Sequence, residues 1–394
     1  MIAIIDLRTS LLFFVFLSGL PLRAADLQRV SLSFYSERLT VTYDQGILLP
    51  SLDRVEDKQI FDYFHQLKNT NYQPLMDDLQ RQRERLKLND WLYYELMVNT
   101  VNRIFSERKQ AEPTLFCWFL LSQAGFDTRL TYLDNEPFVY VYTEDEIFEV
   151  PMIEDNGRSF VNITSVHLGI KSQPALYMLN FAPNPEGTPF RFYLQQLPLL
   201  TPDISKKKLF FVHRQDTLQL QVAIDKTVAR LMSDYPFISE SAYLEVPLST
   251  TLQHSLVPQL KRLIAGKNAI EAVQLLVSFT RSSFKYKEDK EHFGKSKPMI
   301  ADEVFHYPYS DCEDRSALFY CLVKELLDFP MIIVAFPDHL TIGVALPEFV
   351  GNSVQYEGKD YFICDPTGPA NSDVIGEFPY GYEESGFQII GQYR

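Results

Sequence analysis

The chain has 394 residues, of which 46% are hydrophobic and 14% aromatic, and this composition excludes an intrinsically disordered protein. Its formal net charge of −14 argues against a nucleic-acid-binding protein, because affinity for nucleic acid comes mainly from Lys and Arg on phosphates. The one basic run, Lys206–Lys208, is interpreted as a solvated strand edge.

Residues 1–24 have the pattern of a cleaved secretory signal peptide. Arg8 precedes a nearly unbroken apolar run from Leu11 to Leu20, and small residues follow at Ala24 and Ala25. No later window approaches the roughly 18 apolar residues that a membrane helix needs, so no transmembrane segment is predicted. We therefore expect a periplasmic or secreted protein of two or three domains.

The residues from 25 to 170 predict an N-terminal α+β domain. Hydrophobic alternation predicts strand structure over 28–42, and helical spacing predicts one helix over 76–105. The remaining predicted elements are a helix from Leu115 to Gly125, strands at 128–133 and 138–142, and two short strands around Asp155-Asn156-Gly157.

The stretch 171–250 differs in composition. Six prolines interrupt it between Pro174 and Pro202, while the segments beginning at Phe190, Leu209 and Leu218 alternate or run apolar. This pattern predicts a β-rich middle domain, whose role the sequence does not reveal.

Residues 251–394 predict a second α+β domain, because helices precede antiparallel strands. The predicted elements are helices at 255–265, 268–284 and Cys312–Leu327, a loop at 285–311, and strands at 331–336, 339–346 and 359–365.

An internal repeat is suggested by a shift of 203 residues. The shift aligns Leu318 with Leu115 and places Lys109, Glu136 and Asn162 at the positions of Cys312, His339 and Asp365. A true duplication would make the N-terminal domain a degenerate copy with a structural or substrate-binding role. The alternative is that any two helix–strand–strand units match this loosely.

Cys312, His339 and Asp365 have the residue types of a nucleophile, a general base and an orienting carboxylate. Asp311 or Ser310 is a good N-cap and Asp314 completes a capping box, so Cys312 should begin a helix whose N-terminus lowers the thiol pKa. His339 is expected to open a strand and Asp365 to close one. The acidic neighbours of Cys312 oppose the effect of the helix.

Other candidate residues surround this set. Tyr309 and His306 are candidates for lining the cleft or for assisting an oxyanion hole beside the Cys312 N–H. Cys321 and Cys364 are expected in the core, the latter because strand alternation turns it away from Asp365. An oxidising compartment would permit one disulfide, but a nucleophilic Cys312 must stay free. No spacing matches a zinc, calcium or phosphate-loop motif, so no cofactor or metal is predicted.

These features together resemble the transglutaminase-like superfamily, whose triad is papain-like, and in particular its bacterial exported members. The resemblance covers about residues 253–370 and rests on Phe284-Lys285-Tyr286, Gly294–Pro298, Asp311–Ser316, His339 and Asp365-Pro366-Thr367. Ser310, where many members have glycine, and Asp338 depart from the family pattern. The resemblance implies a Cys-bearing helix packed on an antiparallel sheet.

The leading hypothesis is an exported cysteine peptidase or amidase that acts on a peptide or protein through a thioester intermediate. One alternative is acyl transfer from protein glutamine to an amine, which needs the same triad. Another is a non-catalytic cell-envelope binding protein with a relic triad. The sequence does not identify the substrate, the acyl acceptor or the oligomeric state.

Overall fold

The structure, a computed structural model, describes residues 26–108, 111–170, 176–370 and 372–394. The predicted signal peptide, 1–24, lies outside these ranges. Within them, no helix combines the length and the apolar character needed to cross a membrane.

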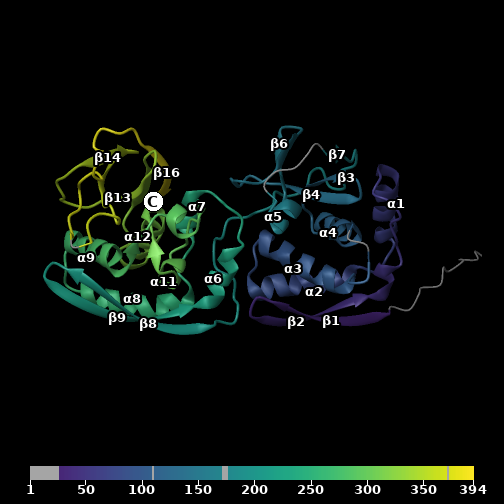
Figure 1. The fold of residues 1–394 in the computed structure, drawn as a ribbon, viewed down its shortest axis with the longest axis horizontal. Helices are drawn as coiled ribbons and strands as arrows, with labels where there is room; N and C mark the ends of the chain where they lie inside the picture. Colours follow the sequence, from purple (N-terminus) through teal and green to yellow (C-terminus); the bar gives the residue numbers. More distant parts are fainter. Residues whose placement is uncertain (1–25, 109–110, 171–175, 371) are drawn as a thin grey trace, which may run out of the picture.

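The described chain forms two lobes that lie side by side, and each is layered in the same way (Figure 1). A long β-hairpin lies at one end of each lobe, helices fill the middle, and a five-stranded sheet lies at the other end. Neighbouring strands in both sheets are antiparallel. The predicted α+β class is thereby confirmed.

The N-terminal lobe begins with its hairpin and ends with its sheet. Its elements are β1 (Leu27–Phe34), β2 (Glu37–Asp44), a 3-10 turn (Gln45–Leu48), α1 (Asp57–Lys68), α2 (Gln73–Leu86), α3 (Asp90–Ile104), α4 (Ala111–Gln123), β3 (Thr128–Leu133), β4 (Glu136–Tyr142), β5 (Met152–Asp155), β6 (Arg158–Asn162), α5 (Ile163–Leu168) and β7 (Tyr177–Met178).

The C-terminal lobe begins with the second hairpin, and two short helices follow that hairpin. The elements from the second hairpin onward are β8 (Ile204–His213), β9 (Asp216–Asp225), α6 (Lys226–Ser233), α7 (Glu240–Glu245), α8 (Thr250–Ile264), α9 (Ala269–Ser283), β10 (Lys285–Tyr286), α10 (Asp289–His292), α11 (Glu303–His306), β11 (Tyr309–Ser310), α12 (Cys312–Leu326), β12 (Met331–Ala335), β13 (Leu340–Val344), β14 (Ser353–Tyr356), β15 (Lys359–Ile363) and β16 (Gln388–Tyr393).

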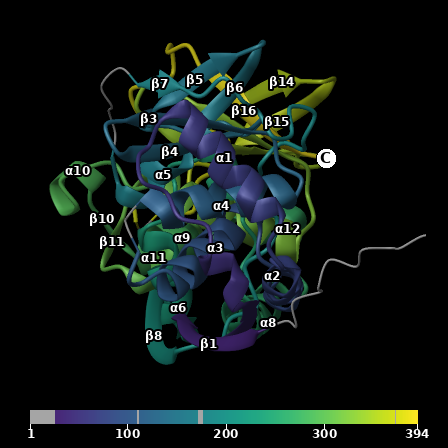
Figure 2. The same cartoon turned by 90° about the vertical axis from the view of Figure 1, so that its right-hand side faces the viewer.

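The two lobes repeat one topology. The strand order is β5-β6-β4-β3-β7 in the first sheet and β14-β15-β13-β12-β16 in the second, so each strand has a counterpart in the same place. The long helix that packs on the sheet is α4 in one lobe and α12 in the other. The shift of 203 residues places β3 on β12 and β4 on β13, which is the correspondence that the sequence suggested. Figure 2, along the line joining the lobes, shows both hairpins at one end and both sheets at the other.

The region predicted as a separate β-rich domain, 171–250, is instead divided between the lobes. Phe190 and Phe192 are fully buried in the core of the N-terminal lobe, without forming strands. The β8–β9 hairpin packs on α8 and α9, and Phe211 and Val222 enter the C-terminal core. The prediction of a middle domain was wrong because the partner of each apolar segment lies far away in the chain.

The helix predicted over 76–105 is two helices. Lys87 follows α2 in the left-handed conformation, with φ of 54°, and Asn89 caps α3 by accepting a hydrogen bond from Leu92 N. Glycine is the usual residue at such a helix end, and lysine gave no sequence signal for the break.

The hydrophobic cluster of the N-terminal lobe extends into two segments of the C-terminal lobe. Tyr243 on α7 and Ile300, in the loop before α11, both belong to the hydrophobic cluster of the N-terminal lobe. Ile300 has no exposed surface. The loop that leads toward α12 therefore packs into the cluster that also holds Met232 of α6 and Tyr243 of α7.

Candidate functional site

Cys312 is the first residue of α12, as the sequence predicted. Asp311 occupies the N-cap, and its N–H donates to Asp314 Oδ2 at 3.1 Å, which is the capping-box contact expected from the sequence. The other oxygen of Asp314, Oδ1, accepts from Met299 N at 2.9 Å. The start of this helix is thus tied to the loop that precedes it.

His339 and Asp365 meet at the edge of the second sheet. His339 lies one residue before β13 and Asp365 two residues after β15, and these strands are antiparallel neighbours. His339 Nε2 lies 3.2 Å from Asp365 Oδ1. The same oxygen accepts from Thr367 N at 3.1 Å and lies 3.5 Å from Thr341 Oγ1. Three donors therefore converge on one oxygen and fix the carboxylate.

Helix α12 brings Cys312 to the beginning of β13. Ser316 Oγ, one turn along the helix, donates to Leu340 O at 3.0 Å, and the backbone of Leu340 also reaches the Cys312 sulfur. The thiol itself donates to Glu313 Oε2 at 2.9 Å rather than to His339. The structure therefore pairs two of the three predicted residues and places the third beside them in a different hydrogen bond.

The electrostatic setting of Cys312 differs from the sequence-based expectation. Burial raises the pKa of the thiol far above its ordinary value, and the charge and hydrogen bond of Glu313 add to this effect. The hydrogen bond from the Leu340 backbone acts in the opposite direction. The predicted lowering by the helix N-terminus is therefore outweighed, and Cys312 is a protonated thiol in this conformation.

Acidic side chains are concentrated around the thiol. Burial and the neighbouring charge of Asp311 raise the pKa of Asp289 to about 6, and burial and Glu313 raise that of Asp311 to about 7. Burial, followed by the charge of Asp311, raises the pKa of Asp314 well above its ordinary value. The region in front of α12 thus carries several carboxyl groups that share one electrostatic field.

Arg281 on α9 holds the chain that carries Asp365. Its guanidinium is buried and donates to Asp365 O through Nε at 2.9 Å and through Nη2 at 2.5 Å. Nη1 donates to Ser372 O at 3.0 Å and to Val374 O at 3.1 Å. Gly368 passes close by, and a Cβ there would come within 2.8 Å of Arg281 Nη2. The sequence signal for this role is that Arg281 lies on the inner face of the helix predicted over 268–284.

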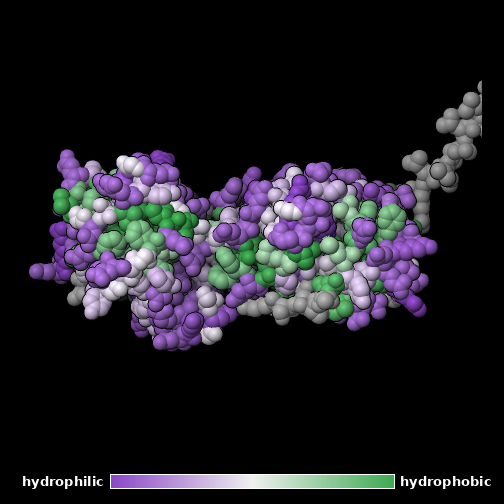
Figure 3. Space-filling view, turned by 90° about the horizontal axis from the view of Figure 1, so that it is seen from above, coloured by the Kyte–Doolittle hydropathy of each residue, from purple (hydrophilic) through white to green (hydrophobic). Residues whose placement is uncertain are grey.

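Tyr382 covers the imidazole. Its ring stacks on that of His339 with centroids 5.3 Å apart, and its hydroxyl donates to Asp338 Oδ1 at 2.5 Å. Tyr382 and Phe378 also pack on the outer face of the sheet around Phe336. Figure 3 shows hydrophobic residues gathered on this sheet side of the C-terminal lobe. Tyr382 lies in a segment without regular structure, so no hydrophobic periodicity in the sequence predicts its contact with His339.

The two accessory candidates lie apart from the triad contacts. Tyr309 pairs with Lys285 in the short β10–β11 ladder. Its ring contacts the ring of His292, and the ammonium group of Lys287 lies over the Tyr309 ring. His306 lies on α11, and its pKa is lowered by burial and by nearby cations including Lys226. The structure does not bring His306 to Cys312.

The remaining cysteines are structural. Cys117, Cys321 and Cys364 are buried free thiols, and the latter two belong to the C-terminal core, as predicted. Cys312 is also free and is 7% exposed.

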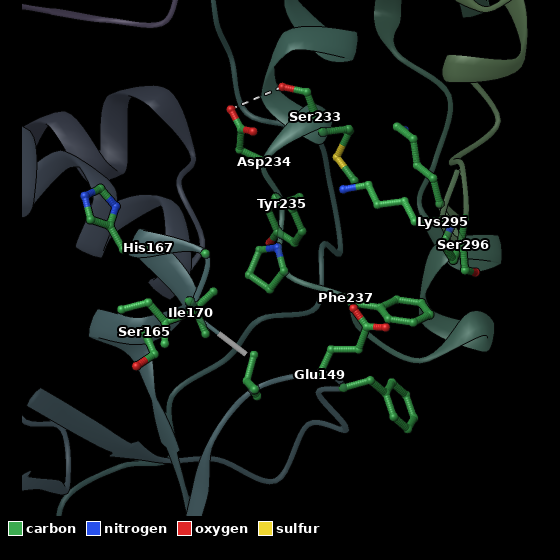
Figure 4. Close-up of a pocket in the computed structure, with 18 of the residues that line it drawn as sticks. Glu149, Ser165, His167, Ile170, Ser233, Asp234, Tyr235, Phe237, Lys295 and Ser296 are labelled. Carbon is green, nitrogen blue, oxygen red and sulfur yellow. Dashed lines mark hydrogen bonds between the residues drawn. The ribbon is translucent and has the colours of Figure 1, made fainter. Parts of the chain in front are cut away.

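A pocket of about 430 Å³ lies between the lobes, away from the triad (Figure 4). Glu149 and His167 come from the N-terminal lobe, Tyr235 from the segment between α6 and α7, and Lys295 and Ser296 from the loop before α11. The same loop continues to the residues that support Asp289 and Asp314, since Lys297 N donates to Asp289 Oδ2. The pocket and the start of α12 therefore share one loop.

Asp302 gives this loop a pH-dependent anchor. Its Oδ2 accepts from Ser249 N at 2.9 Å, while burial, with smaller effects from Asp225 and Glu303, raises its pKa to about 6. Because the folded-state pKa exceeds the ordinary value of 3.8, the ionised carboxylate destabilises the fold above pH 6, and this cost disappears as the pH falls toward 4.

Asp302→Asn keeps an acceptor for Ser249 and cannot ionise. At pH 7.5 the variant should be more stable than the wild type by about 3 kcal/mol, because the pKa rises by about two units and each unit corresponds to about 1.4 kcal/mol. At pH 4.5 the difference should be much smaller. Denaturant unfolding of both proteins at the two pH values measures this, and an equal difference at both would contradict the assignment.

Comparison with protein-family models, with curated proteins and with solved structures finds no match.

Proposed function

We propose that this protein is a cysteine hydrolase that cleaves amide bonds in peptides or proteins. The observation that carries the proposal is the His339–Asp365 pair, with Nε2 and Oδ1 3.2 Å apart, beside the helix that begins at Cys312. A thiol, an imidazole and a carboxylate in this arrangement are the elements of nucleophilic acyl transfer. The same order of residues underlies the resemblance to the transglutaminase-like superfamily.

The hydrogen bonding defines the role of each imidazole nitrogen. Nε2–H donates to Asp365, so Nδ1 is the nitrogen available to accept the thiol proton. Catalysis then requires the Cys312 S–H to turn from Glu313 toward Nδ1. The orienting carboxylate would stabilise the imidazolium that results.

The reaction then has two halves. In the first half, the thiol proton passes to Nδ1 while Sγ bonds to the carbonyl carbon. The C–N bond then breaks as the imidazolium protonates the departing amine, and a thioester remains. Water, deprotonated by His339, attacks the thioester carbon, and the C–S bond breaks to give the carboxylic acid and the thiol. The Cys312 N–H, at the first position of α12, is a donor available to the oxyanion.

Acylation by p-nitrophenyl acetate tests the proposal without knowledge of the natural substrate. We expect Cys312 to be acetylated in the wild type, as located by peptide mass mapping, and His339→Ala to lower that rate by about 100-fold or more, the range for loss of a general base. Cys117, Cys321 and Cys364, which are buried, are controls within the same molecule. Equal rates in the wild type and in His339→Ala would reject a working triad.

The fate of the acyl group separates hydrolysis from transfer to an amine. Release into water at an unchanged rate in the presence of methylamine supports a hydrolase, whereas accumulation of the methylamide supports an acyltransferase. Both reactions use the same three residues, and only the second nucleophile differs.

A non-catalytic binding protein is the second candidate, and one observation favours it. The thiol is held protonated by burial and by Glu313, which is the opposite of the activation expected of a nucleophile. The N-terminal lobe shows how the topology can exist without the triad. There Asn162, in the position of Asp365, caps α5 by accepting from Ser165 N at 2.9 Å. Absence of acylation in the folded wild type would support this candidate.

A further inference from the structure

Two tyrosines flank the reacting groups, and the hydroxyl of each donates to an exposed carboxylate. On the side of α12, Tyr286 Oη donates to Glu288 Oε1 at 2.5 Å. On the side of the sheet, Tyr382 Oη donates to Asp338 Oδ1, also at 2.5 Å. Both carboxylates are on the surface, so a ligand can reach them. The structure thus has two tyrosine–carboxylate pairs, Tyr286–Glu288 and Tyr382–Asp338.

One pair lies beside the thiol helix and the other beside the imidazole. Tyr286 pairs in the β10–β11 ladder with Ser310, two residues before α12 begins. The guanidinium of Arg315, in the first turn of α12, lies over the Tyr286 ring, 5.3 Å from its centroid. The Tyr286 side chain remains 44% exposed, and Figure 2 shows β10 and β11 at one edge of the molecule. On the other side, Tyr382 stacks on His339.

The charges of this region act on both tyrosines. The hydrogen bond to Asp338, followed by burial, raises the pKa of Tyr382 to about 12. The charges of Cys312 and Glu288 add to this increase. Burial, the hydrogen bond to Glu288 and the charge of Cys312 likewise raise the pKa of Tyr286. Both hydroxyls are therefore protonated donors at neutral pH, and both lie within electrostatic reach of the thiol.

The space beside the thiol is acidic. Within the described residues, the ion pairs of the C-terminal lobe include neither Glu288 nor Asp338. Lys287 precedes Glu288 in the chain, but its ammonium group lies over the Tyr309 ring, 5.4 Å from the centroid. Glu313, which accepts from the thiol, adds a further carboxylate. A neutral hydroxyl orients each carboxylate of the two pairs without cancelling its charge, so that charge can act on a ligand.

We propose that the hydrolase acts on peptides or proteins with Lys or Arg at the residue whose carbonyl is attacked, and that Glu288 and Asp338 bind this positive charge. The inference rests on the proposed function, since it assigns a substrate class to the same site. Both pairs border the reacting groups, which places the cationic side chain next to the scissile bond. The rings of Tyr286 and Tyr382 would pack against its alkyl part and attract its charged end.

The p-nitrophenyl esters of Nα-acetyl-lysine and Nα-acetyl-norleucine test this assignment, because norleucine has the same four-carbon side chain without the ammonium group. We expect kcat/KM to be about tenfold higher for the lysine ester, as for two exposed ion pairs with a cation–π contact. Glu288→Gln and Asp338→Asn should each lower this ratio about threefold. Glu291→Gln removes an exposed carboxylate from neighbouring α10, and it should leave the ratio unchanged.

Charged methanethiosulfonates give a second readout that needs no turnover. The Cys312 thiolate attacks the reagent's thio sulfur, methanesulfinate leaves, and a mixed disulfide remains. We expect the trimethylammonioethyl reagent to modify Cys312 about tenfold faster than the sulfonatoethyl reagent, after each rate is divided by that for 2-mercaptoethanol. Peptide mass mapping locates the disulfide. Glu288→Gln and Asp338→Asn should reduce this preference, and Glu291→Gln should not.

The two readouts distinguish this inference from the proposed hydrolase. Acylation of Cys312 by p-nitrophenyl acetate, together with equal rates for the lysine and norleucine esters, would leave the hydrolase and overturn the cationic substrate class. A charge preference that both carboxylate variants retain in full would also overturn it. A charge preference that these variants lose, without acylation by any ester, would reject the hydrolase alone and support the two pairs as a binding site for a Lys or Arg side chain.

Discussion

Asp365→Ala is expected to lower the rate of Cys312 acylation by about 1000-fold, within the range for losing an orienting and charge-stabilising group. The alanine removes the oxygen to which His339 Nε2, Thr367 N and Thr341 Oγ1 are directed. His339 would then lose both its orientation and the charge that stabilises its protonated form.

Asp365→Asn is the matched control, because its Oδ1 can accept the same three hydrogen bonds. We expect it to keep the imidazole in place and to lose only the charge, so the decrease should be about tenfold. Acylation by p-nitrophenyl acetate under the same conditions compares the two variants. Equal losses would show that charge, not orientation, is the contribution of Asp365. No loss in Asp365→Ala would remove this residue from the proposed mechanism.

The second large effect concerns Arg281 and the stability of the C-terminal lobe. Arg281→Met keeps much of the side-chain length but leaves the carbonyl groups of Asp365, Ser372 and Val374 without this donor. An unpaired buried acceptor costs about 1–3 kcal/mol, and only Asp365 is buried while Ser372 and Val374 are partly exposed, so we expect a loss of about 2–3 kcal/mol. Denaturant unfolding measures the change.

Arg230→Met is the control for this variant. Arg230 is about half exposed and pairs with Asp203 at 2.9 Å, so its replacement removes the same charge from the surface and should cost less than about 1 kcal/mol. A similar cost for both variants would mean that the buried hydrogen bonds of Arg281 contribute little.

The sequence predicted those elements whose signals are local. The start of α12 was recognised from Asp311 and Asp314, and the strands around Asn156-Gly157 from their turn residues. The pairing of His339 with Asp365 followed from two strand ends, although each residue lies just outside its strand.

The missed features depend on contacts between distant segments. The β8–β9 hairpin was assigned to a middle domain because its partners, α8 and α9, come later in the chain. The sequence presents Glu313 only as a charge next to Cys312, whereas its hydrogen bond to the thiol depends on side-chain placement within the folded site. Tyr382 reaches His339 from a segment that has no periodic pattern.

Ile300 is fully buried in the hydrophobic cluster that extends from the N-terminal lobe through α6 and α7, and this position limits how the molecule can be divided. The next residue toward the N-terminus, Met299, donates its N–H to Asp314 in the first turn of α12. The cluster that holds Ile300 runs from the N-terminal lobe through α6 and α7, so the loop that supports the reactive helix packs on a core shared by both lobes. A C-terminal fragment that begins after α7 would keep Cys312, His339 and Asp365 but would separate Ile300 from the rest of this cluster, so the triad cannot be excised on its own.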